Sequence, residues 1–378
     1  MPGMECKGVR MPFSFGIEEE YFLVDLESKS VARRMPEGFF EAARSALGES
    51  VSGEFLQSQI EIVTMPHEDV AAARAELRHL RTALGEIACQ HGLAILAAGT
   101  HPTAVWERSR QSEGERYENV MDDLQMIGRR NMLCGMHVHV ELPDPEKRVD
   151  VMTRILPYVP LLIALSTSSP FWRSRRTGLQ GYRLAAYDEL PRTGIPELFK
   201  TKAQFDAYSD ALVRAGVMPD SSYIWWAIRP SLKHPTLELR APDSCTRIED
   251  SIAIASLYRS LVRRLSNNPW QNWDMNAVSR AIIVENKWRA QRYGVHGTFA
   301  RIEGDGPVTV ADMLEVAISE VQKDAEALGC LDEVHHCRRI VADGTSADQQ
   351  IGIYDQFADN PEHALRQVAD WLTETTLQ

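Results

Sequence analysis

The sequence predicts an α+β protein in which strands carry the candidate functional residues and helices fill the last third of the chain. Two observations support this class. Apolar and ionisable residues alternate, as in half-buried strands, in several stretches between residues 13 and 246. Beyond residue 247, apolar residues recur with helical spacing. We therefore expect one catalytic domain over residues 1–378, sheet-rich at 13–246 and helix-rich at 247–378.

The first predicted strand covers residues 15–25 and points Glu18 and Glu20 to one face, about 7 Å apart. Two carboxylates this close repel each other unless a cation lies between them. Glu19 falls on the other face with Ile17 and Tyr21, where it would form a salt bridge or face solvent. The same alternation predicts strands at 55–63, 135–140 and 236–241.

These further strands also have one ionisable face each. It holds Glu61 in the first, His137 and His139 in the second, and Glu238 with Arg240 in the third. Strands that face solvent favour mixed Lys, Thr and Ser over repeated Glu and His. Several strands sharing a carboxylate and imidazole face therefore indicate a floor that holds metal ions.

The remaining elements follow from helical spacing, caps and turn residues. Helices are predicted at 68–91, where Gly92 ends the pattern, at 116–130, at 147–166 with a bend at Pro157 and Pro160, and at 203–215. Strands are predicted at 93–98 and at 223–231, the latter forming a hairpin with 236–241, and residues 167–200 are rich in turns. The last third is predicted to hold helices at 249–265, 275–292, 310–328, 332–341, 347–357 and 362–373, with Thr309 and Ser346 as N-caps.

Composition restricts the class of protein. A hydrophobic fraction of 44% over 378 residues is typical of a soluble globular protein, and the net charge of −12 argues against a nucleic-acid partner. No apolar run reaches the length of a membrane span, and residues 1–10 lack a hydrophobic signal region. The six cysteines show neither a disulfide framework nor metal-ligand spacing. We expect a cytoplasmic protein with no membrane partner.

One stretch departs from the acidic background. Residues 173–192 contain five arginines against two acids, together with several turn-forming residues. Because guanidinium groups bind phosphate oxygens bidentately, this stretch is either a phosphate-binding loop or a solvated surface loop.

The ligand types on the strand faces favour hard cations. Five carboxylates, Glu18, Glu20, Glu54, Glu61 and Glu238, with one imidazole suit Mg²⁺, or Mn²⁺, better than Zn²⁺. The set is larger than one ion needs, which indicates two or more metals of the kind that serve nucleotide phosphates. Neither a Walker A motif nor Gly-x-Gly-x-x-Gly occurs, so the phosphates of ATP would be held by metals and arginines.

Five motifs occur together, in the same order as in a known family. They are GIEEE at 16–20, CGMHVHV at 134–140, PRTGIP at 191–196, HPTLELR at 234–240 and ENKWR at 285–289. In this combination the chain resembles, over about residues 13–300, the carboxylate-amine ligase branch (type 2) of the glutamate-cysteine ligase family. The resemblance implies a glutamine-synthetase-like fold, a curved and largely antiparallel sheet with helices packed on its outer face, binding ATP and several Mg²⁺ ions.

The resemblance also implies a reaction and roles for residues. The γ-carboxylate of glutamate would become an acyl phosphate that an amine such as cysteine captures, in a homodimeric enzyme. Arg240 would steady the transferred phosphoryl group as the catalytic residue. The implied metal ligands are Glu18, Glu20, Glu54, Glu61, His139 and Glu238, and the candidate substrate- or nucleotide-binding residues are Arg192, Lys233, Asn286 and Lys287.

Alternatives remain open at this point. His137 shares a face with His139 and could be the ligand instead, or could support it. Arg240 could pair with acids near Glu238, and the residues around Trp288 could serve packing alone. A metal-dependent hydrolase built on His137 and His139, or a ligand-binding protein without catalysis, are competing functions. No residue stands out as the base for the attacking amine.

Overall fold

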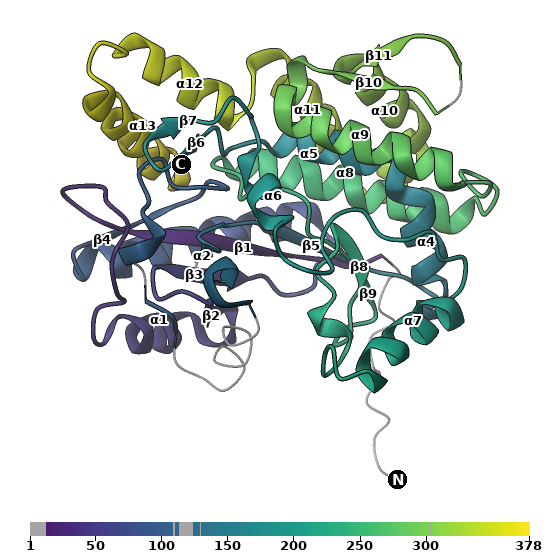
Figure 1. Cartoon of the computed structure of the whole chain (residues 1–378), viewed down its shortest axis with the longest axis horizontal. Helices are drawn as coiled ribbons and strands as arrows, with labels where there is room; N and C mark the ends of the chain where they lie inside the picture. The colour runs from purple at the N-terminus through teal and green to yellow at the C-terminus, as the bar shows by residue number, and fades with distance from the viewer. Residues whose placement is uncertain (1–12, 109, 113–123, 129, 303) are drawn as a thin grey trace.

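An antiparallel sheet lies at the centre of the protein, for which a computed structural model describes residues 13–108, 110–112, 124–128, 130–302 and 304–378 (Figure 1). Within these residues seven strands form the sheet in the order β2-β3-β1-β5-β9-β8, with β4 pairing the second half of β1. The strands are β1 (Phe15–Asp25), β2 (Val51–Gly53), β3 (Gln59–Val63), β4 (Leu93–Leu96), β5 (Met136–Glu141), β8 (Ile228–Pro230) and β9 (Thr236–Leu239). The predicted α+β class is confirmed.

One face of the sheet is apolar and packs on helices. The odd-numbered side of β1 contributes Ile17 and Tyr21, both fully buried, and the neighbouring strands contribute Ile60, Ile62 and Val138 to the same core. Helices α2 (Val70–Gln90) and α8 (Ile248–Asn267) pack against each other and against strands β4 and β5. Since residues two apart in a strand share a face, this packing leaves the ionisable residues on the opposite side.

The ionisable face is open along only part of β1. Beyond Glu20 the same side carries Phe22 and Val24, which are buried in a second apolar cluster. Helix α13 (Pro361–Thr376), drawn in yellow at the upper left of Figure 1, supplies Leu365 and Val368 to that cluster. The C-terminal helix thus covers one end of the face and leaves the end around residues 16–20 free for a site.

Glu19 forms a salt bridge inside the core. Its carboxylate is fully buried and accepts two hydrogen bonds of 2.8 Å from the guanidinium of Arg81 on α2, and further bonds from the hydroxyls of Tyr21 and Ser251. Arg81 also donates to the carbonyls of Cys245, Thr246 and Thr376. This single side chain therefore ties β1 to the segment before α8 and to the end of α13.

The apolar segment at 145–166 is part of the interior. It is long and apolar enough to cross a membrane, so the expectation that no run reaches that length is wrong, yet 89% of its most apolar window is buried within the protein. A 3₁₀ turn at Leu156–Tyr158 separates α4 (Arg148–Ile155) from α5 (Val159–Ser166). Pro157 lies in that turn, where its missing N–H interrupts the α-helical ladder as predicted.

Several predicted boundaries need correction. The strand expected at 55–63 begins only at Gln59. The one expected at 223–231 shrinks to β8, because the backbone N–H groups of Trp225 and Ala227 donate to the carbonyls of Arg192 and Gly194. Strands β4 and β9 end two residues earlier than predicted. The N-cap of α12 (Ser346–Gln356) is Thr345, whose side chain forms a capping box with Asp348, rather than Ser346. The helix expected at 116–130 falls largely outside the described residues.

Of the remaining elements, α1 (Phe39–Leu47) and α7 (Lys202–Arg214) lie in the lower half of Figure 1 and most of the others lie in its upper half. The others are β6 (Phe171–Trp172), β7 (Arg175–Arg176), α6 (Tyr182–Tyr187), α9 (Ala277–Tyr293), β10 (Thr298–Ala300), β11 (Pro307–Thr309), α10 (Val310–Ala327), α11 (Leu331–Asp343) and α12 (Ser346–Gln356). The N-cap of α10 is Thr309, as predicted.

Candidate active site

The register of the sheet brings the predicted site residues into direct cross-strand pairs. Glu20 on β1 lies opposite Glu61 on β3, and Glu18 lies opposite His137 on β5. His139, also on β5, lies opposite Glu238 on β9. Directly opposed residues in antiparallel strands point to the same side of the sheet. The prediction that these strands share an ionisable face is confirmed.

These side chains line a continuous cleft. A cavity of about 310 Å³ is bounded by all six predicted metal ligands and by Lys233 and Arg240. It shares Glu20, Glu54, Trp225 and Arg240 with a neighbouring cavity of about 380 Å³. On its other side it shares Glu18 and His139 with a smaller cavity of about 190 Å³ that has apolar walls. The cleft therefore has an acidic centre and two flanking compartments.

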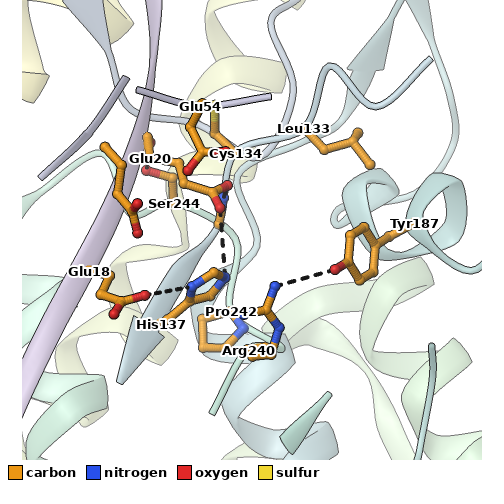
Figure 2. A network of polar contacts seen from close by, with 12 residues as sticks. Glu18, Glu20, Glu54, Leu133, Cys134, His137, Tyr187, Arg240, Pro242 and Ser244 are labelled. Carbon is orange, nitrogen blue, oxygen red and sulfur yellow. Dashed lines mark hydrogen bonds and ion pairs between the residues drawn. The ribbon is translucent and has the colours of Figure 1, made fainter. Parts of the chain in front are cut away.

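His137 lies between the carboxylates of Glu18 and Glu20 on β1 (Figure 2). Its Nδ1 is 3.2 Å from Glu18 Oε2 and its Nε2 is 3.8 Å from Glu20 Oε1. Burial, followed by the charge of Arg240, lowers the pKa of His137. Burial works to raise the pKa of Glu18, but hydrogen bonds and charge from both histidines outweigh it and hold that pKa well below its ordinary value.

His139 is oriented by a hydroxyl. Its Nδ1 is 2.8 Å from Thr236 Oγ1, which turns Nε2 toward Glu18 Oε1 at 3.2 Å. The Nε2 atoms of His137 and His139 are both buried, and among the described residues they face only the carboxylates of Glu20 and Glu18. Single ligand atoms of Glu18, His137 and Glu238 lie within 4.8 Å of one another. This group contains His137, whereas His139 lies opposite Glu238 with its Nε2 beside Glu18, so the two histidines stay alternatives.

A second group of acids lies on the β2 and β3 side. Burial, together with the charge of Glu20, raises the pKa of Glu54 to about 8. Burial also raises the pKa of Glu61, followed by the charges of Glu18, Glu54 and Glu20. Ser52 and the backbone N–H of Gly135 donate to Glu61 and Glu20, at 2.8 and 2.6 Å. These donors do not offset the mutual repulsion, so the group suits a bound cation.

Glu238 is held by two arginines. Arg229 on β8 donates to both of its oxygens, at 2.8 and 3.1 Å, and Arg240 donates to Oε1. Burial opposes the charge on Glu238, but Arg240 and Arg229 outweigh it and lower its pKa strongly. Arg240 also donates to the hydroxyl of Tyr187 at 3.3 Å (Figure 2), while its Nε is buried without a partner among the described residues.

Of the predicted binding residues, Lys233 lines the cleft. Arg192, Asn286 and Lys287 bind other parts of the protein instead. Arg192 donates to the carbonyl of Tyr223 and stacks 5.3 Å from the ring of Trp225, which does line the cleft. Asn286 bonds both backbone groups of Ala300, and Lys287 pairs with Asp188.

The arginine-rich segment does not converge on one site. Arg173 and Arg176 pair with Glu107 and Asp355 at the surface. Arg183 is buried, lines the larger cavity and donates to backbone carbonyls at 240–242. Part of this segment is therefore a solvated surface and part is a wall of the cleft.

Sequence reasoning missed Tyr187 and Arg229 in the cleft, and it marked Arg183 only as one of the five arginines in the stretch 173–192. Arg229 could have been found, because pairing the predicted hairpin in register sets it opposite Glu238. Arg183 and Tyr187 lie on the short helix α6 inside a turn-rich stretch, where no periodicity marks a face. Gly135 gave a weaker signal: a Cβ there would lie 2.1 Å from the Arg183 guanidinium.

Comparison with known proteins identifies the family. The family described as glutamate-cysteine ligase family 2 matches residues 14–368. The chain belongs to this family. A relative from Bradyrhizobium diazoefficiens, named "Putative glutamate--cysteine ligase 2", is 53% identical over 371 residues, which are 98% of this chain and 86% of the relative. A relative of the same name from Rhodospirillum rubrum is 42% identical, covering 90% and 89%.

Solved structures share the fold of this family 2 member. The glutamate-cysteine ligase of Francisella tularensis, in complex with AMP, superposes with a TM-score of 0.71 at 14% identity, over 98% of this chain and 90% of that chain. A bifunctional glutathione synthetase from Pasteurella multocida gives a TM-score of 0.70 at 16% identity, over 96% of this chain and 52% of that chain. The glutamine-synthetase-like fold implied by the resemblance is confirmed.

Proposed function

We propose that this protein is an ATP- and Mg²⁺-dependent carboxylate-amine ligase of the glutamate-cysteine ligase type, joining glutamate to an amine such as cysteine. The observation that supports it most strongly is the floor of five carboxylates and two imidazoles, which come from strands β1, β3, β5 and β9 and from Glu54 after β2, with Arg240 at its edge. Membership of a ligase family supports the reaction class, and an AMP complex of a protein with the same fold supports a nucleotide as ligand.

The residues fit divalent cations as they stand. Repelling half-buried acids, and two imidazole nitrogens that face only carboxylates, form an oxygen-rich donor set of the kind Mg²⁺ prefers. In our proposal, Glu20, Glu54 and Glu61 hold one ion, and Glu18, Glu238 and an imidazole from His139 or His137 hold another. Bound there, the ions would neutralise phosphate charge during phosphoryl transfer.

The chain's own residues then perform two tasks. An amine cannot displace an oxygen of a free carboxylate, because the leaving group would be oxide. Once that oxygen carries a phosphoryl group, it can leave as phosphate. Arg240 lines both the acidic centre and the flanking cavity of about 380 Å³, where it stabilises the charge that moves with the γ-phosphoryl group. Lys233, exposed in the same cleft, binds a phosphate or substrate carboxylate. The role of general base remains unassigned.

The flanking compartments differ in the ligand they suit. The cavity of about 190 Å³ has Phe15, Val63 and Pro235 in its walls, and we assign it to the adenine base. The cavity of about 380 Å³ combines acids and arginines with Leu133 and Trp225, and we assign it to the acid and the amine. The phosphates would lie between them, over the acidic centre.

A screen for ADP release tests the proposed function. The protein is incubated with ATP, Mg²⁺ and pairs of amino acids and amines, and ADP is measured with each component omitted in turn. The ligase should release ADP only when both an acid and an amine are present. Hydrolysis of amide or ester substrates without nucleotide would favour the metal-dependent hydrolase instead, and ATP binding without turnover over a broad screen would favour a non-catalytic binding protein.

Tyr187→Phe should lower kcat of the ligase about tenfold and leave KM for ATP nearly unchanged. The substitution removes one hydrogen bond to the Arg240 guanidinium, and such bonds to charged groups contribute about 1.5–3 kcal/mol. Steady-state kinetics measure the split between kcat and KM. Tyr182→Phe on the same helix is the matched control, because Tyr182 stacks on Trp172 rather than contacting Arg240. Equal kcat values for the two variants would contradict a role in positioning Arg240.

A further inference from the structure

The turn between β8 and β9 borders all three compartments of the cleft. It spans residues 231–235, and its side chains are exposed from Leu232 onward. Leu232, Lys233 and His234 line the acidic centre. Lys233 also lines the cavity of about 380 Å³, and His234 also lines the cavity of about 190 Å³. The position of this one turn therefore affects every part of the cleft where a ligand would bind.

Few bonds within the hairpin hold this turn in place. The backbone N–H of Ser231 donates to the carbonyl of Thr236 at 3.0 Å, and the N–H of His234 donates to the Ser231 hydroxyl at 3.3 Å. Leu232 is 57% exposed, and the Lys233 side chain forms neither a hydrogen bond nor an ion pair with another described residue. A segment with so few contacts keeps a fixed position only when another element supports it.

Arg148, at the start of α4, supports the turn from outside the cleft. Figure 1 shows α4 beside β8 and β9, on which it packs. The Nη1 of Arg148 donates to the carbonyls of Ser231 and His234, each at 2.9 Å, and to that of Thr236 at 3.4 Å. The described walls of the three cleft cavities do not include Arg148. A single side chain thus joins α4 to the beginning, the tip and the end of the turn.

The stability of α4 does not explain an arginine at position 148. Arg148 is the first residue of this helix, where a cation meets the positive end of the helix dipole. Burial lowers the pKa of Arg148, because its charge is partly removed from water, and no described carboxylate forms an ion pair with it. Hydrogen bonds donated by a charged group are strong enough to offset such costs. The carbonyls of the turn are therefore the partners that account for this residue.

The side chains of the turn suit a nucleoside triphosphate. Lys233 brings an ammonium group to the acidic centre, over which the phosphates would lie. The ring of His234 lies edge-on to that of His139 on the floor, with centroids 5.9 Å apart. Because hydrogen bonds weaken steeply with distance, a displacement of the turn by about 1 Å would loosen the contact between Lys233 and a phosphate. The height of the turn above the floor therefore matters for binding.

We propose that Arg148 is a positioning residue for the nucleotide, which fixes the 231–235 turn at the height from which Lys233 binds the phosphates of Mg²⁺-ATP. The proposal rests on the proposed function, because it requires a nucleotide in the cleft. Arg148 itself does not touch the ligand and acts through the carbonyls of the turn. Its effect on ATP binding should therefore depend on the presence of the Lys233 ammonium group.

Isothermal titration calorimetry with Mg²⁺-ATP, in the absence of an acid and an amine, tests this dependence in a double-mutant cycle. Arg148→Ala and Lys233→Ala should each weaken ATP binding at least about tenfold. The double variant should bind at most about threefold more weakly than Lys233→Ala, because the height of the turn matters little once the ammonium group is gone. Arg148→Lys keeps the charge and one donor, so it should lose less affinity than Arg148→Ala.

Lys147→Ala is the matched control. Lys147 precedes Arg148 at the surface, and its contact is with Asp144 at 4.0 Å. This variant should bind Mg²⁺-ATP with the affinity of the wild type. Circular dichroism establishes that each variant is folded, and Arg148→Lys takes the place of Arg148→Ala in the cycle if the alanine variant does not fold.

The outcomes separate this proposal from the proposed function. Equal ATP affinities for the wild type and the folded Arg148 variant would overturn the positioning role and leave the ligase function standing. Losses that multiply in the double variant would also overturn it, because they would show that Arg148 does not act through Lys233. A wild type that does not bind Mg²⁺-ATP would refute the proposed function, and the positioning role with it.

Discussion

Glu238→Gln should abolish ATP-dependent turnover, by about a thousandfold or more, in a protein that stays folded. Glu238 is 2% exposed, lies opposite His139 and accepts hydrogen bonds from Arg229 and Arg240. Glutamine keeps the shape and one acceptor oxygen but removes the negative charge. We expect the neighbouring ion to be lost and Arg240 to move, so both sources of charge stabilisation fail together.

ADP release and thermal unfolding, each with and without Mg²⁺, measure this effect. The wild type should gain thermal stability from Mg²⁺ because the ion binds only the folded state, and the variant should gain less. Glu146→Gln, at an exposed surface position, serves as the control and should match the wild type in both measurements. Near-normal turnover by Glu238→Gln would refute the role of this carboxylate as a metal ligand.

Arg81→Ala should lower the free energy of unfolding by about 3–5 kcal/mol, the usual cost of removing one partner of a buried ion pair. Its guanidinium is fully buried and holds Glu19, Tyr21 and the carbonyls that precede α8 and end α13. Without it, the Glu19 carboxylate remains in the core with hydroxyl partners alone. Because Glu19 lies between Glu18 and Glu20, a loss of Mg²⁺-induced stabilisation should accompany the loss of stability.

Arg78→Ala provides the matched comparison one helical turn away. Arg78 pairs with Glu249 across a largely exposed surface, where ion pairs contribute about 0–1 kcal/mol. Urea unfolding followed by circular dichroism should separate the two variants clearly. Similar midpoints for Arg78→Ala and Arg81→Ala would show that the buried network contributes no more than a surface pair.

The alternating patterns gave reliable information about which side chains share a face. The period of two placed Glu18, Glu20, Glu61, His139 and Glu238 on one side of their strands, and the antiparallel register confirms that side. Boundaries were less accurate. Residues 55–58 continue the alternation of β3 but leave the sheet, because alternation describes a possible strand and not the partner strand that must hydrogen bond to it.

Contacts between distant segments could not be predicted in this way. The sequence offered Glu19 either solvent or a salt bridge, and only the packing of α2 against the sheet chose Arg81. Likewise, Tyr187 and Arg183 reach the cleft because α6 folds over the end of β9, although no local periodicity marks the face on which they lie.

The sequence by itself determined the fold class, the family resemblance and the ionisable face, because these depend on local periodicity and on motif order. The tertiary structure decided what surrounds that face. It closed one end with α13, supplied Tyr187 as a partner for Arg240, and turned Asn286 and Lys287 toward partners elsewhere on the protein. Such contacts join residues far apart in the chain, so they arise only when the helices pack on the sheet.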